Sequence, residues 1–209
     1  MRPPWNAAET GAVDWYHPAG SGHKPRVCFR ILSDGLALWV RYTVEDRWVR
    51  CVHRSFQAPV FEDSCCEIFL QPAESMGYFN IETNTLGTMM VSYITDPKRT
   101  CKGFKGQIQL GPEANREIER CPSIAIGSDG VIDPEISSPV TWELGLRIPF
   151  SLLGTYMGTT ILPGNGAVWR GNVFKCSENS SHPHWGAWSS IGDRLDFHQP
   201  DRFGELVFV

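Results

Sequence analysis

Apolar and polar residues alternate along most of this chain, which is the pattern of strands that bury one face of a sheet. The alternating segments predict strands over Arg26–Leu32, Leu36–Thr43, Trp48–Arg54, Ser64–Gln71, Tyr78–Asn84, Thr88–Ile94, Ser123–Gly127, Thr141–Ile148, Ala167–Cys176 and Gly204–Val209. Turn residues such as those in SDG, SDGVIDP and LPGNG separate these segments. We therefore expect an all-β fold, in which short antiparallel strands form a two-sheet sandwich.

Two segments depart from the alternating pattern. Gly111–Arg120 predicts a helical turn or an irregular crossover, and Pro149–Gly154 predicts one short helix that closes a strand. The sequence shows no internal repeat, low-complexity tract or change in composition that would mark a boundary. Residues 1–209 are therefore expected to form a single domain.

The composition is that of a turn-rich globular protein. Hydrophobic residues make up 42% and charged residues 20% of the 209 residues, and 20 Gly and 15 Pro supply turns. The formal net charge of −4 provides no basic footprint, so we expect no nucleic-acid partner.

The sequence carries no recognisable membrane or export segment. The start, MRPPWNAAETGAVDWYH, lacks the apolar core of a signal peptide, and no later segment reaches the roughly 18 apolar residues of a membrane span. As written, the sequence predicts a cytoplasmic protein without a membrane partner, or a periplasmic or secreted one if a signal peptide was removed. A protein partner or a homo-oligomer remains open.

The chain has 7 cysteines at spacings that match neither a CxxC pair nor a zinc-binding motif. Cys65 and Cys66 are neighbours on a predicted strand, so they point to opposite faces and are poorly placed to bridge each other. We expect reduced thiols, several of them packed in the core.

The run from Ala167 to Ile191 contains three tryptophans together with histidines, asparagines, an arginine and a lysine. Aromatic faces contact the apolar face of a sugar ring, while amide and guanidinium groups pair with its hydroxyls. Trp185 and Trp188 are candidates for this role, and the alternative is that they are core residues beside a polar loop.

The predicted strands also carry asparagines, which are depleted in strands. With period two, Asn80, Glu82 and Asn84 share one face of their strand, and Arg170 and Asn172 share one face of another. Amides, guanidinium and carboxylates match a ring of hydroxyls, although a solvated face or an internal hydrogen-bonded network would explain the same pattern. The ligand-binding candidates are Glu67, Asn80, Glu82, Asn84, Arg170, Asn172, Lys175, His182, His184, Trp185 and Trp188.

An enzymatic function is the alternative to binding. Glu67 and Glu82 suit a two-carboxylate glycosidase, with His182 or His184 as acid and base. The motifs GxSxG, GxGxxG and HExxH and a phosphate-binding loop are missing from the sequence, so other enzyme classes have no support.

Metal binding has weak support in the sequence. His182 and His184 form an HxH pair without a third ligand at a persuasive spacing. Ca²⁺ needs only scattered oxygen ligands, which acidic residues can provide without forming a specific loop motif. These acidic residues are Asp14, Glu45, Asp46, Glu62 and Asp63.

Several motifs spread along nearly the whole chain resemble those of the family 9-like carbohydrate-binding modules of the DOMON-like β-sandwich superfamily. They are Phe61–Leu70, which is similar to the family's DSxE-F element, Tyr78–Asn84 followed by Leu86-Gly87, Trp142–Leu144 leading to Ile148–Phe150 and Leu153-Gly154, Arg170–Asn172, the Trp185/Trp188 loop, and Phe203–Leu206. The resemblance implies a jelly-roll-like sandwich.

The resemblance also implies a site. Such modules hold the end of a glycan between two tryptophans, while a Glu, an Arg and an Asn bond its hydroxyls, and some members carry structural calcium. Glu67 matches the glutamate, Asn172 the asparagine, and Trp185 or Trp188 one of the tryptophans.

Two positions depart from the family pattern. Where the second clamp tryptophan is expected, this chain has Val60, followed by Phe61, with Trp48 and Trp39 farther away. Where an arginine is expected, the Tyr78–Asn84 segment carries Glu82 and Asn84. The superfamily also includes haem-binding domains, for which the axial candidates here would be Met89, Met90, His182 and His184.

Overall fold

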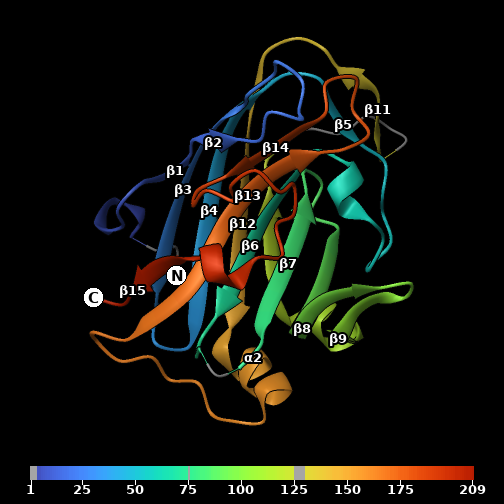
Figure 1. Cartoon of the computed structure of the whole chain (residues 1–209). Coiled ribbons are helices and arrows are strands. Elements are labelled where there is room, and N and C mark those ends of the chain that lie inside the picture. The colour runs from blue at the N-terminus through green and yellow to red at the C-terminus, as the bar shows by residue number, and fades with distance from the viewer. Residues whose placement is uncertain (1–3, 75, 125–129) are drawn as a thin grey trace.

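The computed structural model describes residues 4–74, 76–124 and 130–209, which form two antiparallel sheets packed face to face (Figure 1). The larger sheet runs in the order β2 (Trp15–Tyr16), β14 (His184–Ala187), β13 (Val168–Ser177), β6 (Cys65–Gln71), β7 (Tyr78–Asn84), β8 (Met89–Thr100) and β9 (Gly103–Gln109), and β15 (Gly204–Val207) also pairs with β13. The smaller sheet runs in the order β1 (Gly11–Val13), β3 (Arg26–Ser33), β4 (Ala37–Asp46), β12 (Val140–Pro149) and β10 (Glu119–Pro122).

A few short elements complete the fold. β5 (Val49–Cys51) pairs with β11 (Ile132–Ile136), and the helical turns are η1 (Trp5–Ala7), η2 (Val60–Glu62), α1 (Pro112–Glu117), α2 (Phe150–Met157) and η3 (Pro200–Arg202). In the described ranges, no helix is both long and apolar enough to cross a membrane.

The core lies between the two sheets and follows the alternation of the sequence. Ile68 and Leu70 of β6 and Phe79 and Ile81 of β7 point inward and are fully buried. Trp142 of β12 belongs to the same cluster and is fully buried too. Because successive strand residues point to opposite faces, these inward residues direct their neighbours in sequence to the outer face of the larger sheet.

The predicted all-β sandwich is confirmed, but the predicted strands omit β1, β2, β9, β10, β11 and β14 and differ from the structure at several strand ends. The expected strand Trp48–Arg54 is reduced to β5, and β10 precedes the expected strand Ser123–Gly127. Ser123 and Ile124 lie outside any strand, and residues 125–127 lie outside the described residues. β10 was missed because it is a polar, largely exposed edge strand, which gives no alternation signal.

Both predicted helical turns are present. α1 begins at Pro112 inside the segment Gly111–Arg120. α2 extends beyond the predicted Pro149–Gly154 and ends at Met157, where Gly158 adopts a left-handed conformation with φ of 67°. Glycine tolerates this conformation without steric cost, so it terminates the helix.

The outer face of the larger sheet is covered rather than open to water. Phe197 stacks on Phe174 with ring centroids 4.0 Å apart, and Phe203 packs edge-on against Tyr78. The red segment that contains η3 crosses in front of this face in Figure 1. As a result, every residue of β6 and β7 is buried, and the polar face expected from the sequence is enclosed.

Candidate functional site

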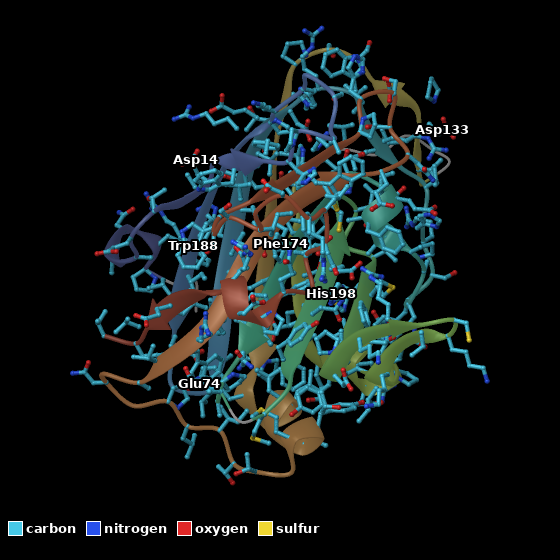
Figure 2. The ribbon with its side chains drawn as sticks, viewed as in Figure 1. Asp14, Glu74, Asp133, Phe174, Trp188 and His198 are labelled. Carbon is cyan, nitrogen blue, oxygen red and sulfur yellow. The ribbon has the colours of Figure 1, made fainter. Side chains whose placement is uncertain are left out.

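Two carboxyl groups lie side by side on the enclosed outer face of the larger sheet. Glu67 of β6 is directly opposite Glu82 of β7, and the two residues are 2% and 4% exposed. Figure 2 shows Phe174 and His198 on this side of the sheet, and Phe174 is the β13 residue opposite Glu67. We call Glu67 and Glu82 the acid pair.

The hydrogen bonds of the acid pair leave acceptors unused. The Cys176 thiol donates to Glu67 Oε1 at 3.1 Å, and Asn80 Nδ2 donates to Glu82 Oε1 at 2.6 Å. Among the described residues, nothing donates to Glu82 Oε2 or Asn80 Oδ1, although both atoms are buried. Buried polar atoms usually have partners, so these two oxygens mark a place where a donor or a cation would be accommodated.

Burial and mutual repulsion keep these carboxyls from ionising easily. Burial raises the pKa of Glu67, and burial followed by the charge of Glu67 raises the pKa of Glu82 well above its usual range. Within the described part of the chain, neither forms an ion pair with a Lys, Arg or His side chain. The site is therefore rich in acceptors and lacks positive charge.

Aromatic side chains pack beside the two cysteines that adjoin the acid pair. Phe61, Trp185 and Phe197 are partly buried and pack against a small cluster that contains Cys65 and Cys176. We call these three aromatic residues the aromatic rim. The Trp185 indole is also fixed by a hydrogen bond from its Nε1 to Glu178 Oε1 at 3.1 Å.

The resemblance left open which residues occupy the two clamp positions, and the aromatic rim contains candidates for both. Trp185 is opposite Cys176 in the pairing of β14 with β13, so its side chain is on the same face as the acid pair. Trp188 instead packs edge-on against Phe29 of the smaller sheet at 5.8 Å, which places it between the sheets. Phe61, next to Val60, packs against the same cluster as Trp185 and Phe197.

Two thiols adjoin the acid pair. Cys65 and Cys176 are directly opposite each other on β6 and β13, and both are buried. One ligand atom from each of Cys65, Cys176 and Glu67 lies within 4.8 Å of the others, a spacing that suits a metal ion. Burial raises the pKa of the Cys65 thiol, so both thiols are expected to be protonated without a cation.

Four of the five acidic residues considered for Ca²⁺, namely Glu45, Asp46, Glu62 and Asp63, are engaged in other contacts. Asp63 accepts hydrogen bonds from the backbone N–H of Val52 and His53, and Glu62 pairs with His53. Glu45 pairs with Arg26 at the surface. Across the described residues, the metal-compatible group with three ligands is the thiol and carboxyl group above, and it contains none of these acids.

A second polar network lies on the opposite, inner face of the larger sheet. Lys175 Nζ is 2.8 Å from His184 Nε2 and 3.4 Å from Asp46 Oδ2 of the smaller sheet. His23 Nε2 is 2.8 Å from Asp46 Oδ1. Burial lowers the pKa of His184 to about 3, so it is neutral. Burial would raise the pKa of Asp46, but Lys175 and His23 together hold it well below its usual value.

The two polar networks separate the residues of the proposed glycosidase site. His184 lies on the inner face of the larger sheet, whereas the acid pair lies on its outer face. His182 stacks on Trp48 with ring centroids 3.6 Å apart. The structure therefore does not bring the histidines to the carboxyls as an acid–base set.

The remaining predicted ligand-binding residues brace loops. Asn84 Nδ2 donates to Asp63 Oδ2, and its Oδ1 accepts from the backbone of the following turn. Asn172 Nδ2 donates to Ser189 O and its Oδ1 accepts from Ser189 N, while Arg170 donates to Phe203 O. Glu67, Asn80, Glu82 and Trp185 are the predicted residues that come together.

Sequence reasoning missed Phe61 as a rim residue in its own right, as well as Phe197, Cys65 and Cys176. Period two places Cys65 on the same face as Glu67, so that association was available from the sequence. The position of Cys176 depends on the register between strands 109 residues apart, and the position of Phe197 depends on a segment without regular structure.

A wide surface hollow of about 1030 Å³ lies elsewhere, beside α2, and its lining includes Arg116, Phe150 and Ser151. It is open, and its lining contains none of the predicted ligand-binding residues. We place the candidate site at the acid pair, because unused carboxyl and amide oxygens coincide there with partly buried aromatic side chains.

The chain thus combines a two-sheet β-sandwich with an enclosed polar group beside an aromatic rim. The model of carbohydrate-binding family 9 matches residues 5–208, and the chain belongs to this family. No curated protein matches the chain.

Solved structures resemble the whole chain. A candidate carbohydrate-binding protein from Bacteroides uniformis is 27% identical to this chain, with a TM-score of 0.82. The match covers 98% of this chain and 88% of the Bacteroides uniformis chain. A family 9 carbohydrate-binding module from Caldicellulosiruptor kristjanssonii in complex with glucose is 14% identical with a TM-score of 0.64, covering 100% of this chain and 88% of its own. The cellotriose complex of a family 9 module from the same organism is 13% identical with a TM-score of 0.62, covering 99% and 85%. These last two share the fold.

Proposed function

We propose that this protein is a non-catalytic carbohydrate-binding domain that recognises a sugar at the aromatic rim above the acid pair. Membership of carbohydrate-binding family 9 supports the ligand class. The observation that carries the location is the coincidence of the unused acceptors Glu82 Oε2 and Asn80 Oδ1 with partly exposed aromatic side chains.

The chemistry of the rim matches a sugar ring. Trp185 and Phe61 offer flat faces for the apolar C–H groups of a pyranose, while the buried acceptors below require hydroxyl donors. Since the acid pair is almost fully enclosed, hydroxyls reach it only when a rim side chain turns aside. Side-chain changes of this kind are common on binding, whereas the strands that carry the acid pair are expected to stay fixed.

The charge of the site narrows the class of sugar. The exposed carboxylate of Glu178 acts on both Glu67 and Glu82 and raises the pKa of each, after the larger effect of burial. An anionic sugar such as a uronate would face like charges without a basic partner, which opposes binding. We therefore propose a neutral sugar as the ligand.

The test is a titration of the purified protein with neutral mono- and oligosaccharides, in which tryptophan fluorescence and calorimetry measure binding. Glucose, cellotriose, galactose and mannose oligomers form the panel, and glucuronate is the charged control. We expect saturable binding of at least one neutral sugar and weaker binding of glucuronate. Absence of binding to every sugar in the panel would refute the proposal.

The bound sugar is then recovered and analysed by chromatography. A binding domain returns it unchanged, whereas shortened or otherwise altered products would show a carbohydrate-active enzyme. In that case, loss of product formation in Glu67→Gln with retained binding would identify the acid pair as catalytic.

A further inference from the structure

The two thiols and the acid pair form one compact group on three adjacent central strands. Cys176 of β13 faces Cys65 of β6, and Glu67 of β6 faces Glu82 of β7. Cys176 Sγ is 3.1 Å from Glu67 Oε1. We call these four residues the thiol–carboxyl cluster. Its members are on paired strands rather than loops, so their positions are held by the sheet.

The cluster has too many acceptors for its donors. Glu82 Oε2 and the neighbouring Asn80 Oδ1 accept no hydrogen bond from the described residues. Cys65 Sγ has a long, weak contact of 3.7 Å with a backbone carbonyl, and its other side-chain hydrogen-bond partner is the Cys176 thiol. A buried acceptor without a donor is destabilising, so the arrangement has room for a positively charged partner.

No basic side chain of the described residues fills that role. Lys175 is adjacent to Cys176 in sequence, but successive strand residues point to opposite faces. Its ammonium lies between the sheets, within 3.4 Å of Asp46 and 2.8 Å of His184. The aromatic rim closes the solvent side with Phe61, Trp185 and Phe197, which carry no charge.

We propose that the thiol–carboxyl cluster binds a divalent metal ion of the Zn²⁺ type, with Cys65 Sγ, Cys176 Sγ and a carboxylate oxygen of Glu67, which lie within 4.8 Å of one another, as ligands. Glu82, which is opposite Glu67 but outside this 4.8 Å group, turns towards the metal to complete the set. Thiolates and carboxylates are ligands of Zn²⁺, and a closed set of four suits a structural site. On binding, the metal–sulfur bonds replace the two S–H bonds, and the thiol protons leave to solvent.

The donor set also selects against other ions. Ca²⁺ takes six to eight oxygen ligands, and Mg²⁺ takes oxygen ligands in octahedral geometry and keeps several waters. Neither suits two sulfurs in an enclosed space, whereas sulfur ligands favour Zn²⁺ and similar metals. This proposal shares Glu82 with the proposed sugar site, but bound metal is measured without any sugar, so failure of one proposal is distinguishable from failure of the other.

The first experiment uses inductively coupled plasma mass spectrometry to measure the metal bound to the purified protein, before and after dialysis with Zn²⁺. We expect about one equivalent of Zn²⁺ per chain that survives gel filtration, as for a structural site. Replacement by Co²⁺ should give the intense absorption of thiolate-to-cobalt charge transfer. A folded protein that retains no metal and gives no such absorption would overturn the proposal.

Variants separate this site from adventitious binding. Cys176→Ser and Glu67→Gln should each lose the metal and the Co²⁺ absorption, while Cys101→Ser, which alters an exposed cysteine, should keep both. Circular dichroism identifies variants that fail to fold. If Cys176→Ser does not fold, Glu67→Gln still tests the site, because it preserves the size of the side chain. Metal retained by both folded cluster variants would contradict the proposal, as would an intact-mass measurement showing Cys65 and Cys176 joined by a disulfide.

Discussion

Lys175 and Asp46 connect the two sheets through a fully enclosed ion pair. The ammonium nitrogen of Lys175 lies 3.4 Å from Asp46 Oδ2, and both side chains are 0% exposed. The Trp142 indole also donates to Asp46 Oδ2, at 3.3 Å. Since Lys175 extends from β13 and Asp46 ends β4, the pair fixes one sheet against the other at this end of the sandwich.

Replacing one member of this pair should destabilise the fold strongly. Lys175→Met leaves Asp46 buried without its cation, and loss of one partner of a buried pair typically costs about 3–5 kcal/mol. Urea unfolding followed by tryptophan fluorescence measures the change. The double variant Lys175→Met with Asp46→Asn should be more stable than the sum of the single effects predicts. Arg26→Met, in the exposed pair with Glu45, is the control and should cost about 1 kcal/mol or less.

The contribution of His184 to stability should fall as the pH is lowered from about 6.5 towards 3, because His184 is buried and neutral. The acid pair, whose pKa values folding raises, opposes this loss until the pH reaches the ordinary carboxyl pKa of 4.5. The pKa of His184 is about 3 in the folded protein and near 6.5 when unfolded. Between these values the unfolded chain binds a proton that the folded chain does not, so acid favours unfolding. At still lower pH, protonation of Asp46, whose pKa is also lowered by folding, adds to the loss.

The variant His184→Gln should flatten this pH dependence by at most about 1.4 kcal/mol per pH unit. Glutamine retains an acceptor for Lys175 but does not titrate. Thermal unfolding recorded at several pH values gives the slope. His17→Gln, at a partly exposed position, controls for the removal of a histidine in general. An unchanged slope in His184→Gln would show that another group causes the acid sensitivity.

Trp185→Ala should weaken sugar binding by about tenfold or more, because it removes an aromatic face of the rim. The measurement is calorimetry with whichever neutral sugar binds the native protein. Trp15→Ala, which alters a tryptophan that is 61% exposed on β2, is the matched control and should bind normally. Equal loss in both variants would exclude the aromatic rim as the binding surface.

Trp188→Ala should lower stability and leave sugar affinity nearly unchanged. Trp188 packs on Phe29, and its ring lies so close to Gly204 that a methyl group there would be 2.7 Å away. Removing a partly buried tryptophan is expected to cost about 2–3 kcal/mol, somewhat less than at a fully buried position. Denaturant unfolding and the same calorimetric titration give the two quantities. A folded Trp188→Ala that no longer binds sugar would place the site at Trp188 instead.

The alternation of residues was sufficient to predict the sandwich and the faces of its strands. Ile68 and Leu70 point into the core, and Glu67 points away from it, as period two requires. Period two also places Glu67 and Cys65 together. It does not show which strands are neighbours, so the pairing of Glu67 with Glu82 and of Cys65 with Cys176 needed the sheet register.

The roles of the asparagines show a second limit. Asn84 and Asn172 looked like ligands of a sugar because asparagine is unusual in strands. Both brace neighbouring loops, since a side-chain amide can satisfy backbone groups that lack a strand partner. Asn84 precedes the turn Thr85-Leu86-Gly87, where a bracing role is common, so this part was predictable from the sequence.

The coverage of β6 and β7 on both faces has a consequence for biosynthesis. Their neighbour β13 and the covering segment with Phe197 and Phe203 are made about a hundred residues later, as the 109-residue separation of Glu67 and Cys176 shows. Until then, the emerging chain presents apolar strands with an unpaired edge, which favour aggregation. Folding of this domain must therefore wait for its last strands to leave the ribosome, and chaperones that shield β6 and β7 during translation should raise its yield.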